Sequence, residues 1–133
     1  MRLLSLLVLG ALTAGCSYGP PQPVSRSPMA QDRLAKELAG LVPGQPVSCL
    51  PHYRSQDMTV IDDNTLLFRD GGRVYRNELQ VSCPLGPAYT LVTRSNSSSL
   101  CRGDIASVTD IRNHFTIGSC VLGDFVPYRR PGA

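Results

Sequence analysis

The stretch T-V-I-D-D-N-T-L-L-F-R-D-G-G-R-V-Y-R, residues 59–76, decides the fold. It holds three short runs of β-branched, apolar and aromatic residues, separated by D-D-N at 62–64 and by D-G-G at 70–72. Aspartate side chains hydrogen-bond nearby backbone N–H groups, and Asn64 can adopt a left-handed conformation, so both separators are turn sequences. The stretch therefore predicts two successive antiparallel hairpins.

The same pattern continues toward the C-terminus. We expect further strands at 89–93, 105–111, 115–122 and 125–126. Gly118 fits a bulge or a close backbone approach, and Gly123-Asp124 fits a tight turn. Six to eight short strands with turn chemistry between them predict a mainly β fold, a small antiparallel barrel or sandwich.

One short helix is expected before the strands. Leu34, Leu38 and Leu41 recur at i, i+4 and i+7, and Gly40 and Pro43 stop the pattern, which predicts a helix at about 31–41. Because so short a helix is marginal alone in water, we expect its leucine stripe to pack against the domain. Binding of the stripe to a partner is the alternative.

The beginning of the chain has the features of an export signal. Met1-Arg2 supplies a positive charge, and the apolar run from Leu3 to Leu12 is too short to span a bilayer. The run ends in L-T-A-G-C, residues 12–16, which resembles the lipobox of bacterial lipoproteins. The resemblance implies that residues 1–15 are a signal peptide, removed before Cys16, and that Cys16 receives a lipid. The alternatives are a plain signal peptide with an incidental cysteine and a buried N-terminal helix.

The same resemblance implies a location. The protein would be anchored in the bacterial cell envelope by acyl chains on Cys16, facing the periplasm. Lipoproteins with aspartate after the lipidated cysteine stay on the inner membrane, so Ser17 favours the outer membrane. Residues 16–30 contain four prolines, which predict an extended tether, and residues 31–133 are expected to form a single domain.

The charge balance excludes one class of partner. Removing residues 1–15 takes away one basic residue, so the 118 remaining residues carry a net charge of +2. That charge is too small for a nucleic-acid-binding protein, and we expect no nucleic-acid partner. Twelve of the thirteen basic residues are arginine, which forms bidentate contacts with phosphate and carboxylate groups, although a GC-rich genome produces the same bias.

The remaining cysteines predict a covalent framework. With Cys16 lipidated, Cys49, Cys83, Cys101 and Cys120 are left, an even number in an oxidising compartment, so we expect two disulfides. Four cysteines allow three pairings, and the sequence does not choose among them. We favour Cys49–Cys120 with Cys83–Cys101, because the first and last strands would meet in a closed sheet. No C-x-x-C motif and no cluster of Cys and His is present, so no metal, redox centre or cofactor is expected.

The function is expected to be non-catalytic. His52, His114, Asp62 and Asp63 are placed near turns without the local context of a catalytic motif. We expect a binding or structural module of the envelope whose partner is a protein, glycan or lipid. The alternatives are a periplasmic enzyme inhibitor that presents the loop 95–99 or the turn 69–73, and a small hydrolase that uses those four residues.

Two further observations concern binding. The candidate binding surface consists of Arg73, Tyr75, Arg76 and Arg102. V-S-C-L-P at 47–51, the segment 93–105 around S-L-C-R-G-D, and G-S-C-V-L-G-D-F-V-P-Y at 118–128 resemble small uncharacterised lipoproteins of alphaproteobacteria. The resemblance covers roughly residues 33–130. It implies one envelope domain, and that family carries no assigned activity.

Overall fold

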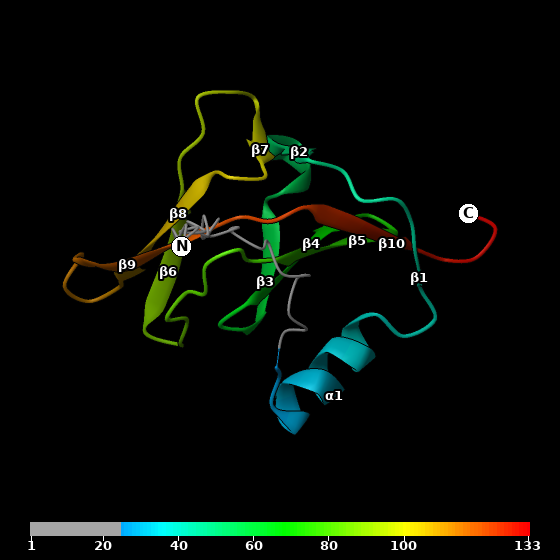
Figure 1. The fold of residues 1–133 in the computed structure, drawn as a ribbon, viewed down its shortest axis with the longest axis horizontal. Helices are drawn as coiled ribbons and strands as arrows, with labels where there is room; N and C mark the ends of the chain where they lie inside the picture. Colours follow the sequence, from blue (N-terminus) through cyan, green and yellow to red (C-terminus); the bar gives the residue numbers. More distant parts are fainter. Residues whose placement is uncertain (1–24) are drawn as a thin grey trace, which may run out of the picture.

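The computed structural model describes residues 25–133, which form one α-helix and ten strands (Figure 1). The helix α1 (Pro28–Glu37) comes first, and the short 3-10 helix η1 (His52–Arg54) follows β2. The strands are β1 (Val42–Pro43), β2 (Cys49–Pro51), β3 (Asp57–Asp62), β4 (Thr65–Asp70), β5 (Arg73–Glu78), β6 (Tyr89–Thr93), β7 (Ser99–Cys101), β8 (Ile105–Asp110), β9 (Thr116–Val121) and β10 (Phe125–Arg129). The predicted signal peptide, Cys16 and most of the predicted tether lie outside the described residues.

The strands form three antiparallel sheets. The larger sheet has the order β1-β10-β5-β4-β3, a second has the order β6-β8-β9, and β2 pairs with β7 in a ribbon. The ribbon lies at the top of Figure 1 and α1 at the bottom. The predicted antiparallel β fold is confirmed. The number of strands exceeds six to eight because β1, β2 and β7 have two or three residues each, too few to show an alternating pattern.

All three sheets contribute to one core. The rings of Phe68 and Phe125 pack with centroids 5.6 Å apart, and Leu50 and Leu100 of the ribbon are buried beside them. Side chains alternate along β4, so Leu67 points to the opposite face from Phe68. The continuous apolar run of β4 is therefore explained by burial on both faces of the larger sheet.

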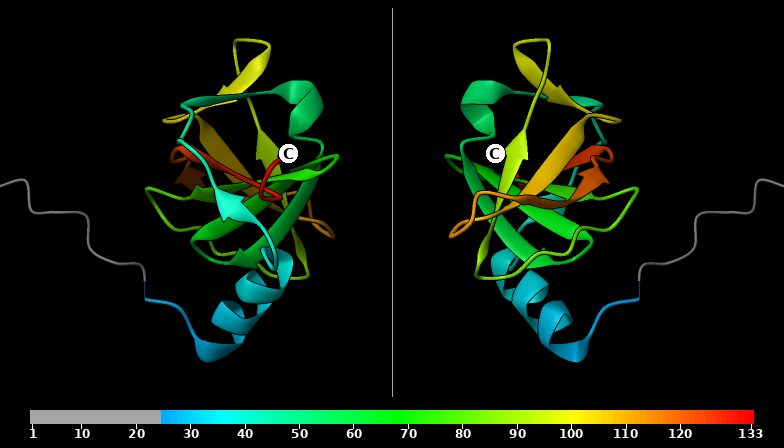
Figure 2. Two further views of the ribbon diagram at one scale, coloured as in Figure 1. Left: turned by 90° about the vertical axis from the view of Figure 1, so that its right-hand side faces the viewer. Right: turned by 90° about the vertical axis from the view of Figure 1, so that its left-hand side faces the viewer.

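The helix α1 covers the outer face of the larger sheet. Leu34, Leu38 and Leu41 pack there against Leu67 and Val74, which confirms that the leucine stripe docks on the domain (Figure 2). This arrangement buries the apolar stripe of a helix that would be marginal alone. Within residues 25–133 no helix is long and apolar enough to cross a membrane.

The bounds of α1 differ from the predicted 31–41. The helix starts at Pro28, where the proline occupies the first turn, and the Ser27 hydroxyl accepts the Ala30 N–H at 3.2 Å. Proline fits this position because the N–H that it lacks has no partner within the helix there. Reading Pro28 as part of the extended tether was therefore wrong. Leu38 caps the C-terminus, and Gly40 follows with a φ of 73°.

Both predicted hairpins are present. The side chain of Asp62 accepts the Asn64 N–H at 2.8 Å in the β3–β4 turn. Asn64 does not adopt the left-handed conformation that the sequence allowed, and a bulge lies between Val60 and Asp62 before the turn. In the β4–β5 turn Gly71 has a φ of 57°. A two-residue hairpin loop of type II′ needs a positive φ at its first residue, which glycine adopts easily.

The strand β10 is longer than predicted and runs through Pro127. The Pro127 carbonyl oxygen accepts the Gly44 N–H at 2.7 Å, so the backbone of this residue faces the short edge strand β1. The N–H that proline lacks would point to the same side. The pairing of β10 with β5 is consequently left intact.

Of the two glycines singled out in the sequence, Gly118 has the role predicted for it, whereas Gly123 allows a close backbone approach where a tight turn was predicted. A Cβ at Gly118 would lie 3.2 Å from Pro84, next to the bulge between Val108 and Thr109. A Cβ at Gly123 would lie 2.0 Å from the Glu78 carbonyl oxygen. The buried Asn77 side chain donates to the Gly123 carbonyl at 2.8 Å and accepts its N–H at 3.0 Å. Only glycine fits this corner without moving the backbone.

Two disulfides are present, but the favoured pairing was wrong. The bridges are Cys49–Cys101 and Cys83–Cys120. The first and last strands do meet, but they do so as β1 and β10, which carry no cysteine. Cys49 lies opposite Cys101 because β2 pairs with β7 in the separate ribbon. Cys83 reaches Cys120 because the preceding segment pairs with the end of β9 through Val81 and Val121.

Candidate functional site

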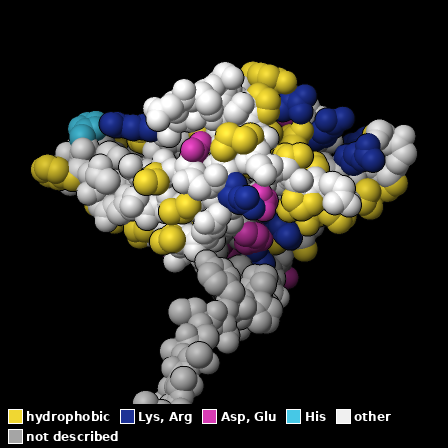
Figure 3. All heavy atoms as spheres, turned by 45° about the horizontal axis from the view of Figure 1, so that its top comes forward, with side chains coloured by type: hydrophobic (Ala, Val, Ile, Leu, Met, Phe, Trp, Pro, Cys, Tyr) yellow, Lys and Arg dark blue, Asp and Glu magenta, His cyan; other side chains and the backbone are white. Residues whose placement is uncertain are grey.

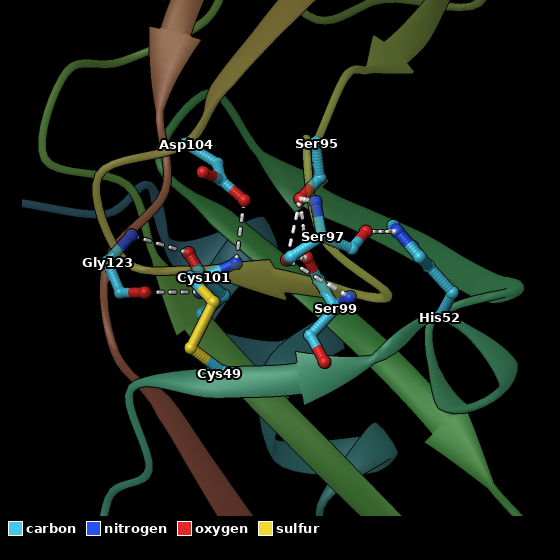
Figure 4. Close-up of a disulfide and its surroundings, with 9 residues drawn as sticks. Cys49, His52, Ser95, Ser97, Ser99, Cys101, Asp104 and Gly123 are labelled. Carbon is cyan, nitrogen blue, oxygen red and sulfur yellow. Dashed lines mark hydrogen bonds between the residues drawn. A yellow bond between two sulfur atoms is a disulfide. The ribbon is translucent and has the colours of Figure 1, made fainter.

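The serine loop, residues 95–99, connects β6 to the ribbon strand β7 and is held by its own side chains. The hydroxyls of Ser95 and Ser97 both donate to the Ser99 carbonyl oxygen, at 2.6 and 2.9 Å. The ring Nε2 of His52 donates to the Ser97 carbonyl oxygen at 2.9 Å, and the His52 N–H donates to the Ser98 carbonyl at 3.1 Å (Figure 4). His52 therefore fixes the loop to η1.

The base of the serine loop is fixed covalently and by burial. The Cys49–Cys101 bridge joins β2 to β7 at the end of the ribbon farther from the loop (Figure 4). Between the bridge and the loop lie Leu50 and Leu100, which are buried opposite each other in the ribbon. The Asp104 carboxylate accepts the Cys101 N–H at 2.8 Å and stabilises the turn that follows β7. The loop thus stands on a rigid support.

The exposed groups of the serine loop are polar and uncharged. The side chains of Asn96, Ser97 and Ser98 are exposed to solvent. Serine and asparagine provide hydrogen-bond donors and acceptors that suit the recognition of a protein surface. The loop lies at the end of the domain opposite α1 and Ser25, the first described residue (Figures 1 and 2).

The predicted binding residues do not form one surface. Tyr75 is buried, 4% exposed, and its hydroxyl accepts a hydrogen bond from Arg54 at 3.0 Å. The prediction that Tyr75 belongs to a binding surface was therefore wrong. Arg76 lies on the opposite face of β5 from Tyr75, over the Tyr128 ring and 3.2 Å from Glu78.

Arg73 and Arg102 are exposed, but they belong to different turns. Arg102 follows the ribbon strand β7 and lies 3.4 Å from Asp124. Arg73 starts β5 and lines two clefts, neither of which includes Arg102.

The residues considered for hydrolysis are also separated. His52 lies in η1 against the serine loop, and His114 lies in the β8–β9 turn with a φ of 58°. Asp62 faces Arg26 at 3.4 Å, and Asp63 accepts the Leu85 N–H at 3.2 Å. Within residues 25–133 no three His, Cys, Asp or Glu side chains are grouped to hold a metal ion. The four residues therefore offer no shared acid–base site.

Two concave sites were not foreseen from the sequence. One is a groove of about 640 Å³ between the edge strands β3 and β6, where Met58, Val60 and Leu91 are partly buried against the core. The other is an arginine cleft lined by Arg54 and Arg129 together with Arg73. Each of the two sites is built from segments far apart in the sequence, so the spacing of apolar residues along the chain did not predict either site. The abundance of arginine was the one signal for the cleft.

No family model matches the chain, and no curated protein or solved structure is significantly similar to it. The site is therefore assigned from its geometry.

Proposed function

We propose that this chain is a lipid-anchored lipoprotein of the bacterial cell envelope whose domain binds a partner protein, without catalysis, through the serine loop. The lipobox-like sequence ending at Cys16 supports the anchor, and Ser17 favours the outer membrane. The observation that carries the binding role is the double fixation of the loop, by internal hydrogen bonds and by the Cys49–Cys101 bridge at its base.

The fixation matters because ordering a loop on binding costs free energy. Each rotamer-rich side chain immobilised at an interface costs about 0.5–1.5 kcal/mol, and a loop already ordered avoids much of this cost. The hydroxyls of Ser95 and Ser97 are already engaged with Ser99, whereas Asn96 and Ser98 stay exposed. The loop thus combines a fixed backbone with free polar side chains.

The position of the loop agrees with an anchor at Cys16. The described chain begins at Ser25, next to α1, at the end opposite the serine loop (Figure 2). A lipid upstream of Ser25 would hold the domain by the α1 end. The serine loop would then face the periplasm, where a partner protein can reach it.

Site-specific photo-crosslinking in the native envelope tests the proposal. A photoreactive amino acid replaces Ser98, and the matched control replaces Asn113, which is also exposed, in the β8–β9 turn. We expect a discrete protein adduct from position 98 and none from position 113. In the same cells Cys16→Ser should release the protein from the membrane fraction. Equal adducts from both positions, or no adduct from position 98, would contradict the binding role of the loop.

An enzyme inhibitor is the second candidate, and the same loop favours it. Ser95 and Ser97 fix the carbonyl of Ser99 before any partner arrives, which suits a loop that must enter an enzyme cleft in one conformation. Purified protein would then abolish one envelope hydrolase activity at a one-to-one ratio. The variant C49A/C101A should inhibit more weakly, whereas an unaltered hydrolase profile would remove this candidate.

A further inference from the structure

Three arginines from separate elements line one cleft, the arginine cleft. Arg54 comes from η1, Arg73 from the start of β5 and Arg129 from the end of β10, around a volume of about 360 Å³. A smaller cleft of about 190 Å³ shares Arg73 and Arg129 and is bordered by Gly44 and Gln45. Basic side chains gather toward the right-hand end of the face in Figure 3, the end at which the C-terminus lies in Figure 1.

The cleft has more positive than negative charge. Among the residues that line the cleft, the acidic side chain is that of Asp70. Its Oδ2 lies 3.2 Å from Arg54 Nε, but the two atoms do not have the geometry of a hydrogen bond. Tyr75 beside Arg54 raises the pKa of the guanidinium above its ordinary value. Arg129 donates at 3.0 Å to the backbone oxygen of Ala133, which also lines the cleft. Among the described residues, Arg73 has no ion pair and no side-chain hydrogen bond.

The β4–β5 turn leaves the cleft open. Gly72 lines the cleft without a side chain, and a Cβ there would meet nothing within 4 Å. The positions of Arg73 and Arg129 are set by the sheet, because β5 pairs directly with β10. The guanidinium groups are therefore attached to a rigid part of the domain.

We propose that the arginine cleft binds a phosphate group carried by an envelope molecule. Guanidinium groups match phosphate oxygens in geometry and charge, and charge-assisted hydrogen bonds are about twice as strong as neutral ones. A tetrahedral phosphate offers enough oxygens to engage three arginines at once, whereas a carboxylate offers two. The phosphate can come from a lipid headgroup or from a soluble phosphate compound. The site shares no residue with the serine loop, and only the envelope origin of the phosphate rests on the proposed function.

The test uses the chain from residue 16 with Cys16→Ser, so that no acyl chain contributes to binding. One arm titrates inorganic phosphate and pyrophosphate and follows the NMR signals of the arginine Nε–H groups and of Gly72. The other arm measures cosedimentation with phosphatidylcholine vesicles that contain phosphatidylglycerol, against vesicles of phosphatidylcholine alone. The variants are R73Q and R129Q, and the matched control is R102Q, an exposed arginine outside the cleft.

We expect the signals of Arg73, Arg129 and Gly72 to shift on titration. R73Q and R129Q should each raise the dissociation constant about tenfold or more, because one hydrogen bond to a charged group contributes enough free energy for a tenfold change in affinity. R102Q should leave the dissociation constant unchanged. Binding in the first arm alone identifies a soluble phosphate, and binding in the second arm identifies a lipid headgroup; each supports the cleft. The proposal is overturned if neither arm shows binding, or if R102Q weakens it as much as R73Q does.

Discussion

The two disulfides should differ in what they contribute, and the difference can be worked out from their positions. Cys49 and Cys101 are 52 residues apart, and Cys83 and Cys120 are 37 apart. Restricting the unfolded chain over loops of these lengths stabilises the folded state by about 4 kcal/mol for each bridge. The lengths alone make the bridges differ by only about 0.3 kcal/mol.

Burial separates the two bridges. Cys83 and Cys120 are 1% and 0% exposed in the core, whereas Cys49 is exposed and Cys101 half-buried. Removing a buried sulfur leaves a small cavity that costs about 1 kcal/mol. C83A/C120A should therefore lower the free energy of unfolding by about 6 kcal/mol, and C49A/C101A by about 4 kcal/mol. Against a total of about 5–15 kcal/mol for a domain of this size, C83A/C120A is close to unfolding.

Urea unfolding of both variants, in a Cys16→Ser background that removes the remaining thiol, measures these losses. Hydrogen exchange adds a local readout: C49A/C101A should accelerate exchange at residues 97–101 beyond its global effect, and C83A/C120A should not. The reasoning is refuted if C49A/C101A costs as much as C83A/C120A, or if it leaves exchange in the serine loop unchanged.

Further variants test the packing that supports the loop. Gly123→Ala should lower the free energy of unfolding by about 3 kcal/mol or more, because its Cβ would lie 2.0 Å from a backbone oxygen. Gly72→Ala, whose Cβ would meet nothing, should change it by less than about 0.5 kcal/mol. Urea unfolding measures both variants. Asn77→Ala should lower the free energy of unfolding by about 2–4 kcal/mol in the same assay, because it leaves the buried N–H and C=O of Gly123 without hydrogen-bond partners. Ser27→Ala removes the helix cap and should cost about 1 kcal/mol, detected as faster hydrogen exchange in the first turn of α1. A loss at Asn77→Ala below that of Ser27→Ala would contradict the role assigned to the buried amide.

Local signals in the sequence were sufficient for the hairpins and for the presence of the β strands of five or six residues, although β10 was predicted too short. D-D-N and D-G-G give turns by short-range hydrogen bonding and by glycine conformation, so residues 57–78 needed no distant partner to be recognised. Tyr89–Thr93 was predicted with its observed bounds. Gly118 was recognised because glycine in an apolar strand sequence often marks a bulge or a close backbone approach, whereas the close approach at Gly123 was not foreseen.

Long-range pairing could not be read from the sequence. The ribbon strands are three residues each, and nothing local in C-L-P or S-L-C indicates that they pair with each other. The disulfide connectivity depends on that pairing, so it could not be predicted either. Tyr75 was predicted to lie on the surface with Arg73 and Arg76, but its position in β5 points it into the core, where Arg54 donates to its hydroxyl.

The attachment of the N-terminal segment bears on how an anchored domain would be oriented. Arg26, next to the first described residue, donates to Thr65 at 2.9 Å, pairs with Glu78 and lies 3.4 Å from Asp62. These partners belong to β3, β4 and β5, so the chain is fixed to the larger sheet before α1 begins. A pull from a lipid on Cys16 would therefore act on the sheet and not on the helix. The serine loop lies at the far end of the same domain (Figure 2), so a lipid on Cys16 would hold the domain at the end opposite the loop.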